Sequence, residues 1–330
     1  MDILDGEILK GFGIVPKYIR KMKYMYIIKA ESGLYIIRKT ETSVDKITFC
    51  HNIKNMIRRK GLRNFDSFEC SEEGLPYFEW EGANYIMTRA GREAPNPDYE
   101  NSGDFKEIVK GIARFHKAAS FGTLSEYTDF CVKNTAESFR NKAAQLNRLR
   151  RLVYRKKRLD DIDYIFLKNY EYYYKLAQES AEGLIHFGYD REEERAAREG
   201  QIIINNADEE AMLLYPSGLY FTELLKLEIG SPLEDLRLVI NRYLKKNSRP
   251  ELTVGEIVKE YSAKNPLNRH QTTLLYYLLI FPERYIKTYA DYYRKGHVFT
   301  PVYVRDAVNK IISDRERHFY WISELLKTGL

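Results

Sequence analysis

Residues 201–225 read QIIINNADEEAMLLYPSGLYFTELL, and this stretch decides the fold of the chain. The apolar run Gln201 to Asn205 predicts a buried strand, and the polar residues after it predict a loop. Ala211 to Tyr215 predicts a second short strand. The tripeptide PSG at 216–218 predicts a tight turn into a third strand, Leu219 to Leu225. The pattern is therefore strand, loop, strand, tight turn, strand.

This order is typical of a phosphotransferase centre. There the loop carries an Asp that positions the acceptor hydroxyl and, five residues later, an Asn that binds metal, and the next strand leads to a metal-binding Asp. The corresponding positions here hold Ala207, Met212 and Thr222. Magnesium requires oxygen ligands, which Met212 lacks, and Ala207 cannot accept a proton. We therefore predict the scaffold of such a centre with no catalytic residue, no metal site and no cofactor.

A shift of one residue leaves an alternative open. Asp208 would then act as the general base and Glu223 as the metal-binding acid. This register places Leu213 where the metal-binding Asn belongs. It also requires the side chains of each strand to exchange faces, because successive side chains of a strand alternate.

Composition limits the class of protein. The chain has 330 residues, of which 44% are hydrophobic and 30% charged, so we expect a folded core in one large domain or two lobes. The formal charge of +6 permits an anionic partner but does not require one. Three scattered cysteines form no metal-binding pattern. We expect no signal peptide and no membrane span, because the N-terminus lacks a basic and apolar leader and the longest apolar run covers only residues 274–281.

Residues 1–90 and 91–330 differ in their predicted secondary structure. The first part contains a hairpin, Tyr24 to Lys29 with Leu34 to Lys39, a helix from Ser43 to Lys60, and strands at 65–70, 75–80 and 83–88. A Gly- and Pro-containing linker at 91–97 follows. The later helices cover residues 102–119, 138–158, 162–183, 232–246, 254–265, 269–281, 283–293 and 301–326. We predict an α+β fold, with a small β-rich N-terminal lobe (1–90) and a large helical C-terminal lobe (91–330) carrying short central hairpins, as one unit.

The hairpin carries two candidate nucleotide-contacting cations, Arg38 and Lys39. Strand alternation puts Lys39 on the face of Tyr35 and Ile37, and Arg38 on the face of Ile36. Both faces carry apolar residues, so periodicity does not tell which cation points inward. The two interpretations are a vestigial phosphate contact and a solvated surface charge.

Three further features have a packing interpretation and a functional one. His116 has no second ligand at metal-binding spacing, which favours a packed or hydrogen-bonded histidine. The basic run Arg148 to Arg158 spreads around its helix, with Leu149, Leu152 and Val153 as the buried seam. It favours a solvated face or a dock for an acidic partner over nucleic-acid binding. The 27 tyrosines indicate amphipathic packing or a surface for protein contacts and oxidative cross-linking.

Several segments in a fixed order carry a family resemblance: GLYIIRK at 33–39, YIMT at 85–88, GRE at 91–93, ARFHKAA at 113–119, SPLEDL at 231–236, FPERY at 281–285 and YY at 292–293. Together they resemble the CotS family of spore coat proteins, which share the fold of aminoglycoside phosphotransferases and choline kinases. The resemblance spans residues 10 to 325. It implies a bilobal protein-kinase-like fold.

The resemblance also implies the pattern from which this chain departs. The family carries His-Gly-Asp, an Asn five residues after that Asp, and a later Phe-Asp pair. Here Asn205-Asn206-Ala207 stands in the triplet, Met212 in the Asn position and Phe221-Thr222 in the pair.

We therefore predict a pseudokinase, a catalytically inactive structural or scaffold component of the bacterial spore coat that acts in sporulation. Its expected partners are other spore coat proteins, without nucleic acid. It would be made in the mother-cell cytoplasm and located in the spore coat. The alternatives are an atypical phosphotransferase using Asp208 and Glu223 and a nucleic-acid-binding module.

Overall fold

An antiparallel sheet forms the N-terminal part of the computed structural model, which describes residues 4–91, 93–222, 224–294 and 300–327. Its strands are ordered β1-β2-β3-β6-β4, and β5 pairs with β6. Their bounds are Pro16–Met22 (β1), Met25–Ala30 (β2), Gly33–Thr40 (β3), Phe68–Glu69 (β4), Phe78–Trp80 (β5) and Ala83–Arg89 (β6). The predicted hairpin is confirmed, because β2 and β3 pair in register.

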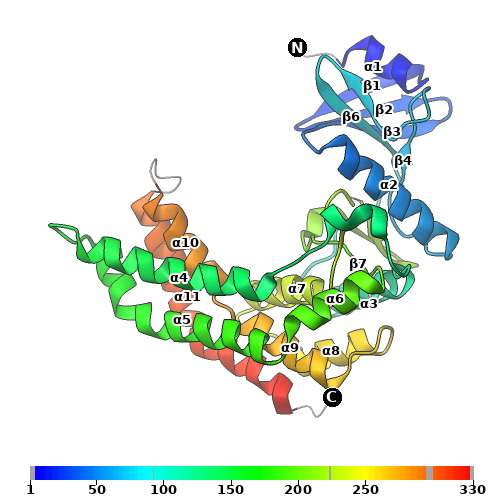
Figure 1. The fold of residues 1–330 in the computed structure, drawn as a ribbon. Coiled ribbons are helices and arrows are strands. Elements are labelled where there is room, and N and C mark those ends of the chain that lie inside the picture. Colours follow the sequence, from blue (N-terminus) through cyan, green and yellow to red (C-terminus); the bar gives the residue numbers. More distant parts are fainter. Residues whose placement is uncertain (1–3, 92, 223, 295–299, 328–330) are drawn as a thin grey trace.

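Helices cover the two faces of this sheet. Helix α1 (Gly6–Gly11) contributes Ile8 to an apolar cluster with Ile28, Tyr35 and Ile37. Helix α2 (Val44–Arg59) belongs to a second, larger cluster that includes Phe68 and Ile86 and continues into the helical part of the chain. Figure 1 shows α2 between the sheet and the helices below it. Thus α2 lies between β3 and β4 in the sequence but shares the core of the helical lobe.

The rest of the chain is mainly helical. The helices are α3 (Ser102–Ala118), α4 (Thr135–Tyr154), α5 (Asp161–His186), α6 (Tyr189–Arg198), α7 (Pro232–Lys246), α8 (Val254–Ser262), α9 (Arg269–Ile280), α10 (Glu283–Tyr293) and α11 (Pro301–Ser323). Short 3₁₀ segments are Ser125–Phe130, Glu209–Ala211 and Glu324–Lys327. Two small sheets pair β7 (Ile202–Ile203) with β10 (Glu228–Ile229) and β8 (Met212–Tyr215) with β9 (Gly218–Phe221).

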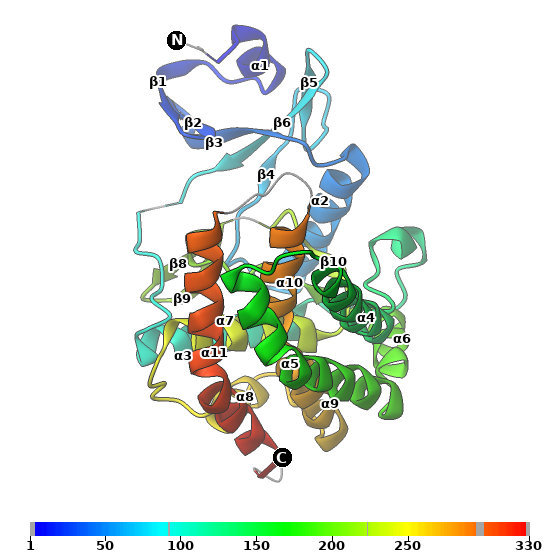
Figure 2. The same cartoon turned by 90° about the vertical axis from the view of Figure 1, so that its left-hand side faces the viewer.

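Four helices, α4, α5, α10 and α11, extend to one side of the molecule, and we call them the helical arm (Figures 1 and 2). Helix α4 packs along α5, and α10 packs against both α4 and α11. Tyrosines fill this contact, since Tyr173 stacks on Tyr285 at 3.7 Å between ring centroids. The packing interpretation therefore holds for these buried tyrosines, whereas Tyr154 and Tyr164 are exposed.

Some predicted elements differ from the observed ones. The strand predicted at 201–205 is paired only at 202–203, and the strand predicted at 219–225 ends at Phe221. Strand β1 and helix α6 were not predicted. Within the basic run, Leu149 and Val153 are buried as expected, but Leu152 is 53% exposed, so its placement in the seam was wrong. No described helix combines the length and apolar character that crossing a bilayer requires.

Candidate functional site

The loop after β7 is held by one buried carboxylate, that of Asp235 in the first turn of α7. The backbone N–H of Ile204 donates to its Oδ2 at 2.7 Å, and that of Asn205 donates to its Oδ1 at 2.8 Å. Asn205 has φ 52°, a left-handed conformation that Asn tolerates better than most residues. These two amides donate to Asp235 and not to a neighbouring strand. Strand β7 therefore ends at Ile203, and the start of the loop is fixed by Asp235.

A chain of buried side chains supports Asp235 from behind. His116 Nε2 lies 2.8 Å from Asp235 Oδ2, and His116 Nδ1 lies 2.8 Å from the Tyr261 hydroxyl. Asn265 donates to that hydroxyl at 2.7 Å. Burial raises the pKa of Tyr261, so its O–H stays protonated and donates to Nδ1. In this order of donors His116 Nδ1 accepts from Tyr261 and Nε2–H donates to Asp235, and the predicted hydrogen-bonded histidine is confirmed.

The three positions expected to carry chemistry lie on this loop and the β8–β9 hairpin. Ala207 is half-buried, and its carbonyl accepts from the Tyr99 hydroxyl at 2.8 Å. The Met212 side chain is buried in the main apolar cluster and pairs across the hairpin with Phe221. The Thr222 N–H donates to the carbonyl of Ala211 at 2.9 Å. The hairpin is therefore joined to the loop by packing and main-chain bonds.

The alternative register depends on Asp208 and Glu223. Asp208 accepts a hydrogen bond from Arg242 of α7 at 2.6 Å. The same guanidinium donates to Glu209 at 2.7 Å, so both acidic side chains are turned toward α7. Glu223 lies outside the described residues.

The structure separates the two hairpin cations. Arg38 pairs with Ile86 in the β3–β6 ladder and therefore lies on the face that packs against α2, as Ile86 does. Lys39 is exposed and lies on the opposite face, with Tyr35 and Ile37. Arg38 is thus the cation on the face toward α2. Strand alternation in the sequence did not determine which of the two cations faces inward.

The turn between β1 and β2 is the place where a kinase carries its glycine-rich phosphate loop. Here two residues, Lys23 and Tyr24, connect Met22 to Met25, and neither is glycine. The turn instead presents an exposed tyrosine, with the Lys23 ammonium 4.9 Å from the ring centroid.

Helix α2 carries a buried cation. The acidic residue of α2 is Asp45, at its N-terminal end, whereas Lys54 in the helix interior is only 2% exposed. Lys54 Nζ lies 2.8 Å from Asp66 Oδ1 and 3.8 Å from the centroid of the Phe68 ring. The buried charge of this helix is therefore positive, and the carboxylate of Asp66 in a neighbouring loop neutralises it.

Helix α2 is also bonded to the helical lobe. Lys46 Nζ donates to the carbonyl of Leu227 at 2.5 Å, and Phe49 stacks on Phe130 at 4.5 Å. The following loop joins β9, because Asp66 N–H donates to the carbonyl of Phe221 and Phe221 N–H donates to that of Asn64. These contacts connect the two lobes through protein groups alone.

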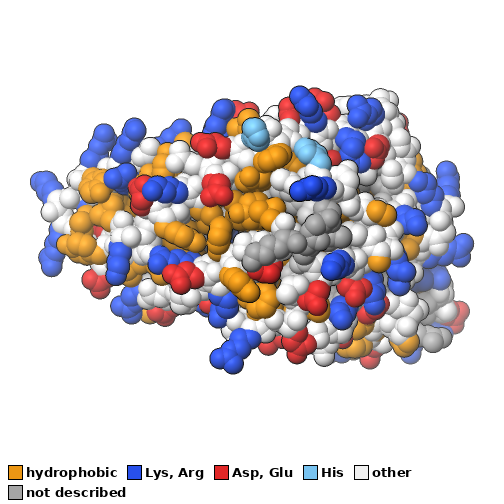
Figure 3. Space-filling model, turned by 90° about the horizontal axis from the view of Figure 1, so that it is seen from below, with side chains coloured by type: hydrophobic (Ala, Val, Ile, Leu, Met, Phe, Trp, Pro, Cys, Tyr) orange, Lys and Arg blue, Asp and Glu red, His pale blue; other side chains and the backbone are white. Residues whose placement is uncertain are grey.

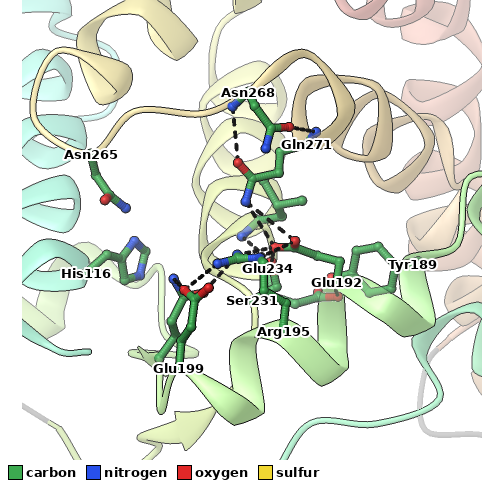
Figure 4. Close-up of polar contacts among 12 residues, drawn as sticks. His116, Tyr189, Glu192, Arg195, Glu199, Ser231, Glu234, Asn265, Asn268 and Gln271 are labelled. Atoms are coloured by element: carbon green, nitrogen blue, oxygen red, sulfur yellow. Dashed lines mark hydrogen bonds and ion pairs between the residues drawn. The ribbon is translucent and has the colours of Figure 1, made fainter. Parts of the chain in front are cut away.

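A second buried polar network lies beside His116 (Figure 4). Arg195 donates to both oxygens of Glu192 at 2.7 and 2.8 Å, and Ser231, the N-cap of α7, donates to Glu192 at 2.7 Å. Gln271 of α9 reaches the same carboxylate at 3.3 Å. Although burial alone would raise it, these bonds lower the pKa of Glu192. The network fixes α6, α7 and α9 against one another.

Magnesium nucleotide, which the fold implies, does not fit the described part of this centre. Met212 offers no oxygen and its side chain lies in the core, and Thr222 is a neutral hydroxyl. Within the described ranges no three His, Cys, Asp or Glu side chains gather closely enough to hold a metal ion. Arg38 remains a group that could contact a phosphate.

Sequence reasoning did not assign roles to four residues of this centre: Lys54, Asp66, Asp235 and Arg242. For Asp235 a signal existed, because SPLED at 231–235 places two acidic residues in the first turn of a helix behind a Ser cap and a Pro. Lys54 and Asp66 carried no signal, because a lysine within a helix is normally solvated.

Comparisons with known proteins agree with the fold described above. A family model described as "Spore coat putative kinase YutH" matches residues 6–325. No curated protein matches the sequence. The fold is similar to that of an aminoglycoside phosphotransferase from Alicyclobacillus acidocaldarius, with a TM-score of 0.84 at 12% identity over 100% of this chain and 97% of that one.

Two further solved structures are similar. A spectinomycin phosphotransferase, APH(9)-Ia, bound to AMP has a TM-score of 0.64 at 14% identity, covering 98% of this chain and 96% of its own. The amicoumacin kinase hAmiN, in complex with AMP-PNP, Ca²⁺ and its substrate, has a TM-score of 0.59 at 10% identity, covering 95% and 91%. The kinase-like fold expected from the sequence is confirmed.

Proposed function

The chain belongs to the YutH family of spore coat kinase-like proteins, and from this premise we propose that it is a catalytically inactive scaffold component of the spore coat. One observation carries the proposal. The position that should supply a metal-binding amide holds Met212, whose side chain is packed in the apolar core. Ala207 and Thr222 replace the other two catalytic side chains.

The contacts between the lobes support a structural role. A kinase closes its lobes around nucleotide and opens them to release product. Here Lys46 and Phe49 tie α2 to the helical lobe, and the Lys54–Asp66 pair ties α2 to the loop whose main chain is bonded to Phe221 of β9. A protein whose lobes are joined by such contacts presents one constant surface to its partners. We place the boundary between the lobes after residue 90, next to the end of β6 at Arg89.

Two surfaces are our candidates for contacts with other coat proteins. The first is the tip of the helical arm at residues 148–158, where Arg148, Arg151 and Arg155 are exposed beside the apolar Leu152 and Tyr154. Lys156 is paired with Asp160 and Asp163, which reduces the local positive charge and disfavours nucleic acid as the partner.

The second surface is the underside of the arm. Figure 3 shows apolar side chains gathered over the half of this face that carries α5 and α11. Tyr164 and Ile185 of α5 and Tyr320 of α11 are each more than half exposed. Apolar side chains grouped in this way favour protein contact. The protein would be made in the mother-cell cytoplasm and recruited to the coat through these surfaces.

The competing hypothesis is an atypical phosphotransferase that uses Asp208 and Glu223. It requires Asp208 to break its hydrogen bond with the guanidinium of Arg242. It also lacks the metal-binding amide, because Leu213 occupies the position of the metal-binding Asn when the register is shifted by one residue.

A thermal-shift titration separates the two hypotheses. A ligand that binds the folded state raises the melting temperature, so ATP with Mg²⁺ should leave it unchanged, or shift it no more than ATP with EDTA does. A Mg²⁺-dependent rise that disappears in Glu223→Ala would favour the phosphotransferase. For the coat role, a fluorescent fusion should form a shell around the forespore, and fluorescence throughout its interior would contradict the assignment.

A further inference from the structure

We propose that a cavity between the helical arm and α7 binds a small organic anion, a carboxylate or phosphate ester on an apolar or aromatic body, with Arg284 as its counter-ion. This inference is independent of the scaffold proposal, because the cavity is lined by residues of α5, α7, α9, α10 and α11 and by none of the loop residues 204–211. Its volume of about 350 Å³ suits a small ligand.

The walls of the cavity are apolar and aromatic. Leu238 of α7, Tyr173 of α5 and Phe319 of α11 line it, and Tyr173 is fixed by its stacking on Tyr285. Pockets of this kind bury the body of a ligand on apolar walls and orient it with a few polar groups. A purely inorganic ion would leave these walls without a contact.

Arg284, at the start of α10, supplies the charge. It lines the cavity and is half-buried, and among the described residues no carboxylate lies within ion-pair distance of its guanidinium. The other two arginines of the cavity are engaged: Arg237 donates to Glu234 and Glu283, and Arg315 donates to Asn169. A half-buried cation that forms no ion pair has lost part of its hydration, and binding an anion would offset that cost.

The neighbouring charges favour an anion. The acidic groups that line the cavity form ion pairs with other cations, Glu283 with Lys142 and Arg237, and Asp314 with Arg317. Asp314 also lies close enough for its charge to act on Arg284, but it forms no ion pair with that guanidinium. Lys245 of α7 lies close enough to Arg284 for their charges to interact, and burial together with this repulsion lowers the pKa of Lys245. The free charge of the site is therefore positive.

Two neutral groups complete the site. Burial, and then the charge of Arg284, lowers the pKa of His318 to about 4, so the ring is uncharged at neutral pH and can donate or accept one hydrogen bond. Asn241 of α7 also lines the cavity, and its amide has no hydrogen-bond partner among the described residues. Together they can orient the oxygens of a carboxylate or phosphate held by Arg284.

The test compares isosteric probes on the full chain. Benzoate and phenyl phosphate represent the two anionic groups, and benzamide is the neutral control for the same ring. We expect each anion to bind at least about tenfold more tightly than benzamide, as a charge-assisted hydrogen bond would give. Isothermal titration measures the affinities, and comparison of the two anions tells whether the site prefers a carboxylate or a phosphate.

Two variants locate the binding. Arg284→Gln removes the cation and should abolish the preference for the anions, whereas Lys287→Gln removes an exposed charge one turn along α10 and should leave it intact. Equal affinity for benzoate, phenyl phosphate and benzamide, or a preference unchanged in Arg284→Gln, would overturn the proposal.

A measurement on the unmodified chain covers the case in which Arg284→Gln does not fold. The His318 ring resonances, identified by their loss in His318→Gln, should shift on titration with benzoate and stay in place with benzamide. Unshifted His318 resonances at a saturating benzoate concentration would refute the site.

Discussion

The buried pair Lys54–Asp66 gives the sharpest test of how α2 is held. Its atoms lie 2.8 Å apart, and the two residues are 2% and 6% exposed. Removing one partner leaves a buried charge unpaired, which costs about 3–5 kcal/mol. Lys54→Met also removes the cation from the Phe68 ring, a contact worth up to about 2 kcal/mol when desolvated.

The double variant Lys54→Met with Asp66→Leu removes both charges and fills the site with apolar side chains. Such replacements are neutral or stabilising in other proteins, so we expect it to lie within about 2 kcal/mol of the wild-type stability. The effects of the single variants should therefore not add, and the coupling energy should exceed about 3 kcal/mol. Urea unfolding measures these differences from the midpoints at constant slope.

An exposed pair on α5 provides the matched control. Lys175 and Glu171 lie 3.6 Å apart with most of their surface in solvent. The same Met and Leu substitutions there should cost under about 1 kcal/mol and add independently. If Lys54→Met cost as little as Lys175→Met, or if the Lys54 and Asp66 variants were additive, the pair would not be what holds α2 and the argument would fail.

Three further predictions concern the loop, its pH response and the thiols. Asp235→Asn should lower the free energy of unfolding by about 3 kcal/mol. In the wild type both carboxylate oxygens accept from backbone or ring N–H groups, and the NH₂ group of the variant would face one of these donors. An unchanged urea midpoint would contradict this prediction. Burial alone would raise the pKa of Glu209, but bonds from Lys246 and Arg242 lower it to about 2. Its contribution to the free energy of unfolding is therefore complete above about pH 4.5 and is lost as the pH falls toward 2. In Glu209→Gln the free energy of unfolding should consequently fall less between about pH 4.5 and pH 2 than it does in the wild type, which acid titration measures. Burial raises the pKa of Cys50 to about 11, so a thiol reagent at pH 8 should label exposed Cys70 rapidly and Cys50 only after unfolding, as peptide mapping would reveal.

Sequence periodicity predicted the long helices well, since α7 and α10 lie at the predicted residues 232–246 and 283–293. A capping box also marks the start of α8, where Thr253 and Glu256 exchange hydrogen bonds with each other's backbone. Local patterns sufficed there because the signals lie within a few residues of one another.

The remaining features depend on contacts between distant residues. Strand β1 carries Lys17, Arg20 and Lys21 on an exposed edge, so it lacks the apolar alternation that marks a strand. The early end of β7 depends on Asp235, some thirty residues later. The inward orientation of Arg38 depends on its pairing with β6. None of these contacts leaves a local pattern in the chain.

Asp235 holds its loop through main-chain amides, and this has a consequence for substitutions in the loop. A bond to a peptide N–H does not depend on which side chain that residue carries. Exchanging the side chains of Ile204 and Asn205 therefore leaves both anchoring bonds available, and the path of the backbone is set independently of the chemical groups that the loop displays.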